Sequence, residues 1–287
     1  QVRPAGSGHA LGAADRLHIE FELVVIGGGP SGLAATSYAL HAQLQVAMIA
    51  PDLGGKVSFP FSLRDVPRRD TVWGASLVHE FEQNVRANLV NHLSTTVTAL
   101  RPLEDGGFAL KLEDGSRVQA RAVILSTGSR AQRLYVPGET EYWSKGVSFS
   151  AISHAPFFAG KKVAVIGSGD RAVNAVLALT QLCEKIYFIL GQGGNREQSA
   201  LWDLALRNPK VLTFHEWEVQ QIIGDEYVTA LSLVGANGEI REVEVEGVFV
   251  QFGLLPNNNL VRDLVELDHE GHVIIDEYCQ TSLPGLF

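Results

Sequence analysis

The chain has 287 residues, a formal net charge of −9 at pH 7, and 46% hydrophobic against 19% charged residues. The length favours two domains, the composition is that of an ordinary globular protein, and the acidic balance argues against a nucleic-acid partner. The apolar runs are too short to cross a membrane and the two cysteines stand in unrelated contexts, so we expect a cytoplasmic protein without a disulfide framework or a metal site.

The first element is a glycine-rich turn between two apolar stretches. Residues 21–26 predict a buried strand, and residues 34–42 predict a helix. Between them stand Gly27, Gly29 and Gly32 in the spacing Gly-x-Gly-x-x-Gly. In that spacing the first glycine permits a tight turn, the second lets a pyrophosphate approach, and the third lets the helix pack on the strand. The order of elements favours a dinucleotide-binding loop over an ordinary βα turn.

A less regular stretch follows this loop. Residues 45–49 predict the next strand, and the nearest acidic residue beyond it that could bind a ribose is Asp52. Gly54 and Gly55 form a second glycine turn. Residues 75–90 predict a helix with one inward face. That face consists of Leu77, Phe81 and Val85.

The middle of the chain predicts a hairpin, a buried strand and a crossover. Residues 108–112 and 117–121 flank a turn with Asp and Gly, which is typical of a hairpin. Residues 122–128 predict a buried strand that ends in a glycine, and residues 129–147 predict a crossover between domains.

The opening pattern returns in the second half. A strand from residue 163 leads into Gly167 and Gly169 in the spacing Gly-x-Gly-x-x-Ala, and a helix follows to about Cys183. Residues 185–190 predict the next strand. The remaining predicted elements are a hairpin at 229–245 that turns at an Asn-Gly pair, a strand at 247–252, a return crossover at 253–256 and a strand at 272–276.

These elements predict an α/β protein with two Rossmann-like domains, the second inserted in the first. We expect residues 1–17 to form a flexible N-terminal arm, residues 18–132 and 253–287 the first domain, and residues 133–252 the inserted domain.

The ordered motifs resemble those of the low-molecular-weight thioredoxin reductases. They are the two glycine loops, the pair Gly54-Gly55, the Leu-Ser-Thr-Gly run at 125–128 and the closing run at 281–287, and the likeness covers residues 21–287. It implies an FAD domain interrupted by a pyridine-nucleotide domain, a homodimer, and a Cys-x-x-Cys that passes electrons from the flavin to a thioredoxin-like protein.

The resemblance also implies which residues hold cofactors. Residues near Val97 would face the adenine of FAD, and Gly167, Gly169 and Arg196 would belong to the second nucleotide site. The residues implied in FAD binding are Gly27, Gly29, Pro30, Ser31, Gly32, Asp52, Gly54, Gly55, Val57, Thr127 and Gly128.

The expected dithiol is the first departure from the family. Its two positions are occupied by Ser150 and Ser153. A serine hydroxyl is almost never ionised near neutral pH and cannot form a disulfide, so dithiol exchange is absent from the chain as written. His154 stands where the family has an acidic residue, and a histidine can act as an acid near neutral pH or be an ordinary polar loop residue.

The second departure concerns the nicotinamide cofactor. Family members that bind NADPH carry several arginines after the strand at 185–190, whereas here Leu190, Gly191 and Gln192 occupy those places and Arg196 alone remains. NADPH is therefore not the expected donor. The pattern resembles branches of the family that take electrons from ferredoxin or carry a second flavin in this site, and a site without a ligand is the remaining alternative.

The third departure is the end of the chain. The family continues past the Pro-Gly-Leu-Phe turn at 284–287 into a segment that closes over the flavin, and we expect the chain to lack that last part.

Three functions fit this sequence. The first is a thioredoxin-reductase-like FAD disulfide oxidoreductase that does not use NADPH and whose redox cysteines are replaced by serine, by engineering or in nature. The second is a dithiol-free flavin oxidoreductase resembling ferredoxin-NADP reductase. The third is a redox-inactive flavin-binding protein.

Overall fold

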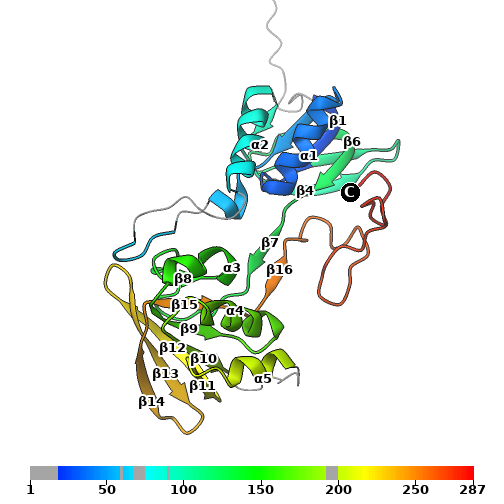
Figure 1. Cartoon of the computed structure of the whole chain (residues 1–287). Coiled ribbons are helices and arrows are strands. Elements are labelled where there is room, and N and C mark those ends of the chain that lie inside the picture. The colour runs from blue at the N-terminus through cyan, green and yellow to red at the C-terminus, as the bar shows by residue number, and fades with distance from the viewer. Residues whose placement is uncertain (1–18, 59–60, 67–74, 89–90, 192–199) are drawn as a thin grey trace, which may run out of the picture. The chain divides into compact units, whose positions relative to one another are not determined.

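The computed structural model describes residues 19–58, 61–66, 75–88, 91–191 and 200–287. The chain divides into two compact units (Figure 1). The first comprises Gln1–Val57, Leu77–Gly128 and Asn257–Phe287, and the second comprises Ser58–Ser76 and Ser129–Pro256. The predicted arm at 1–17 and the predicted ligand Arg196 lie outside the described residues.

The first unit is built on a six-stranded sheet in the order β3-β2-β1-β6-β5-β4. Strands β1, β2 and β6 are parallel, and β5 joins β6 and β4 in antiparallel pairs. The elements are β1 (Ile19–Ile26), α1 (Pro30–His41), β2 (Val46–Ile49), η1 (Gly55–Ser58), α2 (Ala75–Asn88), β3 (His92–Leu93), β4 (Val97–Pro102), β5 (Phe108–Leu112) and β6 (Arg117–Leu125).

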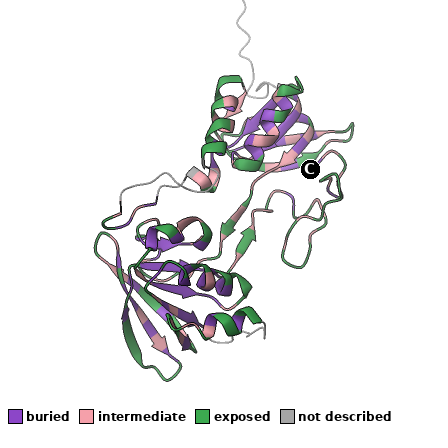
Figure 2. Cartoon of the chain, viewed as in Figure 1, coloured by how far each residue is buried: buried purple, intermediate pink, exposed green. Residues whose placement is uncertain are grey.

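Both faces of this sheet are covered by other parts of the first unit. Val24 and Val25 are fully buried although they point to opposite faces of the sheet, so both faces are packed (Figure 2). Strand β6 has two roles, because its first half pairs with β5 in the predicted hairpin while its whole length runs parallel to β1. The predicted hairpin and the buried strand at 122–128 are therefore one continuous element.

The inward face of α2 differs from the prediction. Leu77 is 55% exposed, whereas Val78 and Val85 are buried and Phe81 is partly buried. The face therefore follows the spacing i, i+3, i+7 instead of i, i+4, i+8. Both spacings lie close to one side of a helix, and the packing of Val78 and Val85 against the sheet decides between them.

The second unit contains a parallel five-stranded sheet in the order β11-β10-β9-β15-β8. A three-stranded antiparallel sheet, β12-β13-β14, and the antiparallel pair β16-β7 accompany it. The elements are β7 (Ser129–Ala131), β8 (Val147–Ser148), α3 (Ala151–His154), η2 (Ala155–Phe158), β9 (Lys162–Ile166), α4 (Asp170–Thr180), β10 (Lys185–Leu190), α5 (Ala200–Leu206), β11 (Val211–His215), β12 (Trp217–Gly224), β13 (Val228–Gly235), β14 (Ile240–Glu244), β15 (Gly247–Val250) and β16 (Leu254–Pro256).

The predicted elements of this unit are confirmed in type. Strands β9 and β10 occupy their expected places, β13 and β14 form the expected hairpin, and α4 ends at Thr180, a few residues before the expected position. The sequence analysis missed α5, β11 and β12. The prediction of an α/β fold with two Rossmann-like parts is confirmed.

One predicted strand is wrong. Residues 272–276 form no named strand in the described structure and contribute only isolated bridges, Leu267 to Val273 and Ile275 to Thr281. Ile274 and Ile275 are about half exposed. The apolar run there has no neighbouring strand to pair with along its length, so its β-propensity is not expressed. Instead, Leu286 is buried and bridges to Val123 of β6.

No helix formed by the described residues has the length and apolar character needed to cross a bilayer.

Candidate functional site

Close backbone packing requires glycine at Gly27, in the turn after β1, and at Gly32, in the first turn of α1. Gly27 has a φ of +112°, and a Cβ there would lie 2.3 Å from the carbonyl oxygen of Ser126. A Cβ on Gly32 would lie 1.9 Å from the carbonyl oxygen of Gly27. The turn and the close packing of α1 therefore depend on these two glycines.

Gly29 is different because it faces open space. A Cβ built there meets no atom within 4 Å, and its φ of −73° suits any residue. Gly29 is the N-cap of α1, and no side chain caps that end. Pro30 and Ser31, which follow it, are exposed. The amides of the first turn are therefore presented to an anion, and the residues fit the diphosphate of a dinucleotide.

The second glycine turn packs directly on this loop. The amide of Gly54 donates to the carbonyl oxygen of Gly28 over 2.8 Å, and a Cβ on Gly28 would lie 2.2 Å from the carbonyl oxygen of Asp52. Gly55 has a φ of +58°, and its Cβ would lie 2.9 Å from the Cα of Gly29. Val57 follows in η1 and is partly buried. The structure therefore brings these sequence-predicted residues together.

The run after β6 completes the loop cluster. The hydroxyl of Thr127 donates to the carbonyl oxygen of Asn257 over 2.7 Å, and the Asn257 side chain donates back to the Thr127 carbonyl over 2.9 Å. The amide of Asn257 donates to the carbonyl oxygen of Gly128, and the hydroxyl of Ser126 donates to the carbonyl oxygen of Ile26. Sequence reasoning missed Ser126 and Asn257. Ser126 stands beside a predicted residue, but Asn257 is distant in sequence and no local signal marks it.

Val97 is not part of this cluster. Its strand, β4, is separated from β1 by β5 and β6, and the Val97 side chain is 5% exposed in a core that includes Phe108. The structure therefore does not bring the Val97 side chain to the glycine loops.

Ser150 and Ser153 lie together at the start of a short helix in the second unit. Ser150 is the N-cap of α3, and its hydroxyl oxygen accepts from the amide of Ser153 over 3.4 Å. The two hydroxyl oxygens are 3.0 Å apart. Ile152, between them in sequence, is 81% exposed. The predicted pair is thus in direct contact.

His154 occupies an apolar, largely enclosed position. Its ring stacks on Phe61 with the centroids 4.1 Å apart, and its Nδ1 lies 2.8 Å from the hydroxyl oxygen of the buried Ser148. The same hydroxyl accepts from the amide of Ser150 over 3.1 Å. Burial lowers the pKa of His154 to about 4. The ring is therefore neutral near pH 7 in this conformation, and the role of His154 as an acid stays a prediction. Sequence reasoning missed Ser148 and Phe61.

The low pKa of His154 predicts a pH-dependent stability. Because the folded pKa is about 4 and the unfolded value is 6.5, the unfolded chain binds more protons between these values, and stability is lost as pH falls through that window. Lowering the pH from 7 to 5 should cost about 2 kcal/mol at this residue. His154→Phe keeps the ring stacking on Phe61 and has no titrating group. In urea unfolding of the second unit, its free energy of unfolding should therefore fall by about 2 kcal/mol less between pH 7 and pH 5.

The control for this experiment is His269→Gln. His269 belongs to the first unit, so its replacement should leave the pH dependence of the second unit unchanged. If the free energy of unfolding falls equally between pH 7 and pH 5 in His154→Phe and in the unaltered chain, His154 is not the source of the pH dependence.

The second glycine loop borders a cavity within its own unit. A Cβ on Gly167 would lie 2.8 Å from the carbonyl oxygen of Gln251, so the turn needs glycine, whereas a Cβ on Gly169 would meet nothing within 4 Å. The cavity has a volume of about 330 Å³. It is lined by Leu134, Val136, Ile166, Gly167, Ser168, Ile189, Gly191, Trp217, Glu218, Val219 and Phe252.

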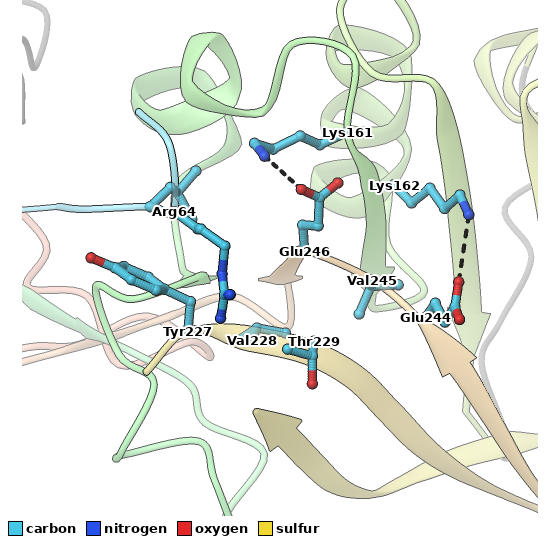
Figure 3. A pocket seen from close by; sticks show the side chains of 10 residues that line it. Arg64, Lys161, Lys162, Tyr227, Val228, Thr229, Glu244, Val245 and Glu246 are labelled. Atoms are coloured by element: carbon cyan, nitrogen blue, oxygen red, sulfur yellow. Dashed lines mark hydrogen bonds and ion pairs between the residues drawn. The ribbon is translucent and has the colours of Figure 1, made fainter. Parts of the chain in front are cut away.

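A second cavity of the same unit, of about 320 Å³, is lined by charges that neutralise each other. Lys161 pairs with Glu246 and Lys162 pairs with Glu244, as Figure 3 shows. Arg64, which also lines the cavity, pairs with Asp225. The two lysines lie at the amino end of β9. Ligands of parallel sheets bind at the carboxyl ends of the strands, which favours the cavity at Gly167.

The fold and the loops define a class of protein, an α/β oxidoreductase with two nucleotide-type glycine loops. Residues 21–287 match the family model of the pyridine nucleotide-disulphide oxidoreductases. The chain belongs to this family, and its resemblance to the thioredoxin reductases is confirmed.

Solved structures and curated sequences agree with this assignment. The thioredoxin reductase of Streptococcus pyogenes is 30% identical, with a TM-score of 0.80 over 94% of this chain and 89% of that one. A component of the alkyl hydroperoxide reductase of Xanthomonas campestris pv. phaseoli is 33% identical over 93% of this chain and 51% of its own length. The NADH dehydrogenase of Bacillus subtilis is 31% identical over 93% of this chain and 52% of its own length. The chain spans about half the length of the curated relatives it matches.

Proposed function

We propose that this chain is an FAD-binding, thioredoxin-reductase-like disulfide oxidoreductase in which serines occupy the dithiol positions. The observation that carries the proposal is the open face of Gly29 at the uncapped start of α1. Glycine is not needed there by the packing, so its absent side chain leaves room for a ligand. The FAD residues named from the sequence lie in the same loop cluster, apart from Val97.

When bound, FAD would supply two-electron transfer between a donor and an acceptor disulfide. The residues of this chain would bind and orient it: the amides at Gly29 would hold the diphosphate, and the hydrogen bonds between Thr127 and Asn257 hold the adjoining loop in place. Ser150 and Ser153 keep the positions and the contact of a dithiol but cannot exchange with a disulfide. The proposed acceptor is a thioredoxin-like protein and the proposed assembly is a homodimer.

We expect NADPH to reduce the flavin slowly or not at all. Leu190 and Gly191 stand where arginines would bind the 2′-phosphate, and loss of such contacts weakens binding by a factor of about 10² to 10⁴. Anaerobic stopped-flow absorbance measures the bleaching of the flavin band, with dithionite as the control for full reduction. Rapid stoichiometric bleaching by micromolar NADPH would contradict this expectation.

A variant that restores an arginine at this site tests the explanation directly. A Cβ at Gly191 would meet no atom within 4 Å, so the backbone leaves room for a side chain there, and Gly191→Arg should tighten NADP⁺ binding. Unchanged NADP⁺ affinity would show that the missing arginines are not the reason for a weak response.

A flavin oxidoreductase without a dithiol, resembling ferredoxin-NADP reductase, is the second candidate. It is favoured by the serines and by the neutral state of His154 at pH 7, which leaves its ring without the acidic proton that a thiolate would take. Flavin reduced by dithionite and mixed with thioredoxin, ferredoxin or oxygen distinguishes the candidates. Oxidation by ferredoxin alone supports this second function, and a flavin that none of the three oxidises supports a redox-inactive binding protein.

A further inference from the structure

The imidazole ring of His154 is held between two aromatic side chains. Phe61 stacks on one face with an interplanar angle of 20°, and Phe157 meets the ring edge-on at 71°, with the centroids 6.2 Å apart. Both phenylalanines are buried. Close packing of this kind leaves the imidazole two orientations, which are related by a half-turn about its Cβ–Cγ bond. A contact in the plane of the ring must select between them.

The segment that carries Phe61 is fastened to the second unit, to which it belongs. Phe61 and Leu63 are buried in the same core cluster of that unit. The next residue, Arg64, pairs with Asp225 over 2.5 Å, in the turn between β12 and β13. Phe61 is therefore a fixed wall for the ring of His154.

The contact in the plane of the ring is the hydroxyl of Ser148. Ser148 is the last residue of β8 and is 1% exposed. Its oxygen accepts from the amide of Ser150 over 3.1 Å. Its single proton has two acceptors within reach, the Nδ1 of His154 at 2.8 Å and the carbonyl oxygen of Ser150 at 3.2 Å. The first distance is that of an ordinary hydrogen bond, whereas the second is longer than is usual for a hydroxyl donor.

The other groups in this network favour the same placement of the proton. The carbonyl oxygen of Ser150 already accepts from the amide of His154 over 3.2 Å, so it does not depend on the hydroxyl. Burial lowers the pKa of His154 to about 4, so at pH 7 the ring is neutral and carries one proton. If the hydroxyl of Ser148 donates to Nδ1, that one proton lies on Nε2.

The Nε2 atom is available to a ligand. It has no hydrogen-bond partner among the residues that the structure describes, and it reaches solvent, since it is not one of the buried polar atoms that lack a partner. A neutral N–H at this atom donates a hydrogen bond without giving up its proton. Such a donor stabilises negative charge that develops on a neighbouring atom.

We propose that Ser148 is a positioning residue for His154. Its hydroxyl donates to Nδ1, selects one orientation of the ring, and holds the tautomer whose proton lies on Nε2. His154 then acts as a neutral hydrogen-bond donor to a thiolate. The thiolate rests on the proposed disulfide chemistry, whereas the tautomer depends only on hydrogen bonds of the chain itself.

Nitrogen NMR of the FAD-loaded chain at pH 7 tests the proposal. The protonated and the bare nitrogen of a neutral imidazole differ widely in chemical shift, so correlations with the ring protons report the ratio of the two tautomers. His154→Gln identifies the signals of His154 among the nine histidines. In the parent chain the Nε2–H form should be in about tenfold excess or more. Ser148→Ala, which removes the hydrogen bond and adds no volume, should lower that ratio by about two- to tenfold.

Two further variants separate the hydroxyl from its surroundings. Ser232→Ala removes a hydroxyl from β13 of the same unit, where it donates to the side chain of Gln220, and should leave the ratio unchanged. Phe61→Leu removes the stacked ring but keeps Ser148, and should change the ratio less than Ser148→Ala does.

Three results would overturn the proposal. They are a proton on Nδ1 in the parent chain, a ratio that Ser148→Ala leaves unaltered, and an equal or larger effect of Phe61→Leu. None of these measurements involves an electron donor or a disulfide. Failure of the proposed function, seen as absent disulfide reduction, is therefore distinguished from failure of this inference.

Discussion

Gly29→Val is expected to lose its FAD while the protein remains folded. A Cβ at Gly29 meets no protein atom within 4 Å and its φ is negative, so valine fits the backbone. The added methyl groups occupy the space in which the diphosphate would approach the amides of α1. Flavin released by denaturation should fall by about tenfold or more per chain, and the circular dichroism spectrum should stay that of the parent.

Gly169→Val is the matched control. Gly169 has the same place in the second loop, is also an N-cap without a side-chain cap, and also faces open space. This variant should keep its FAD at the first loop. Gly32→Val offers a contrast, since its Cβ would lie 1.9 Å from the Gly27 oxygen and should impair folding. Full flavin content in Gly29→Val would refute the assignment of the first loop.

The double variant Ser150→Cys with Ser153→Cys should form a disulfide that the flavin can reduce. The two hydroxyl oxygens are already 3.0 Å apart, and sulfur atoms at these positions need only small rotations to reach the length of about 2.05 Å of a disulfide. A thiolate at position 150 is favoured because the Ser150 hydroxyl oxygen accepts a hydrogen bond from the amide of Ser153 at the start of α3. Anaerobic photoreduction of the flavin should then produce two additional free thiols per chain.

The two cysteines of the parent chain contribute the background signal of this thiol assay. Cys183 is buried, with its pKa raised to about 12 by burial, and Cys279 is exposed, so the parent chain sets the baseline for thiol counts. Each single cysteine variant should gain no thiols on photoreduction. If the double variant forms its disulfide but reduced flavin leaves it closed, the disulfide-reductase function fails and the flavin-only oxidoreductase is favoured.

The features that could be predicted from sequence are those encoded by neighbouring residues. Both glycine loops, with the strand before and the helix after each, and the hairpin of β5 and β6 depend on spacings of a few residues, because turn geometry and side-chain periodicity are local. The contact between Ser150 and Ser153 is of the same kind, since the two residues are three positions apart at the N-cap and in the first turn of α3. These patterns specified the fold class, the family and most of the first loop cluster.

The tertiary structure decided what depends on distant segments. The pKa of His154 is lowered by burial, and the ring on which it stacks, Phe61, is distant in sequence, so neither is visible in the residues beside it. Asn257 joins Thr127 across a separation of 130 residues, and Leu77 rather than Val78 faces solvent because of the sheet beneath α2. Glu218 lines the same cavity as Ile189 because β11 pairs with β10 and the chain turns at Glu216. Local propensity specifies the elements, whereas the surroundings of a side chain, and therefore its chemistry, arise from the long-range packing that joins them.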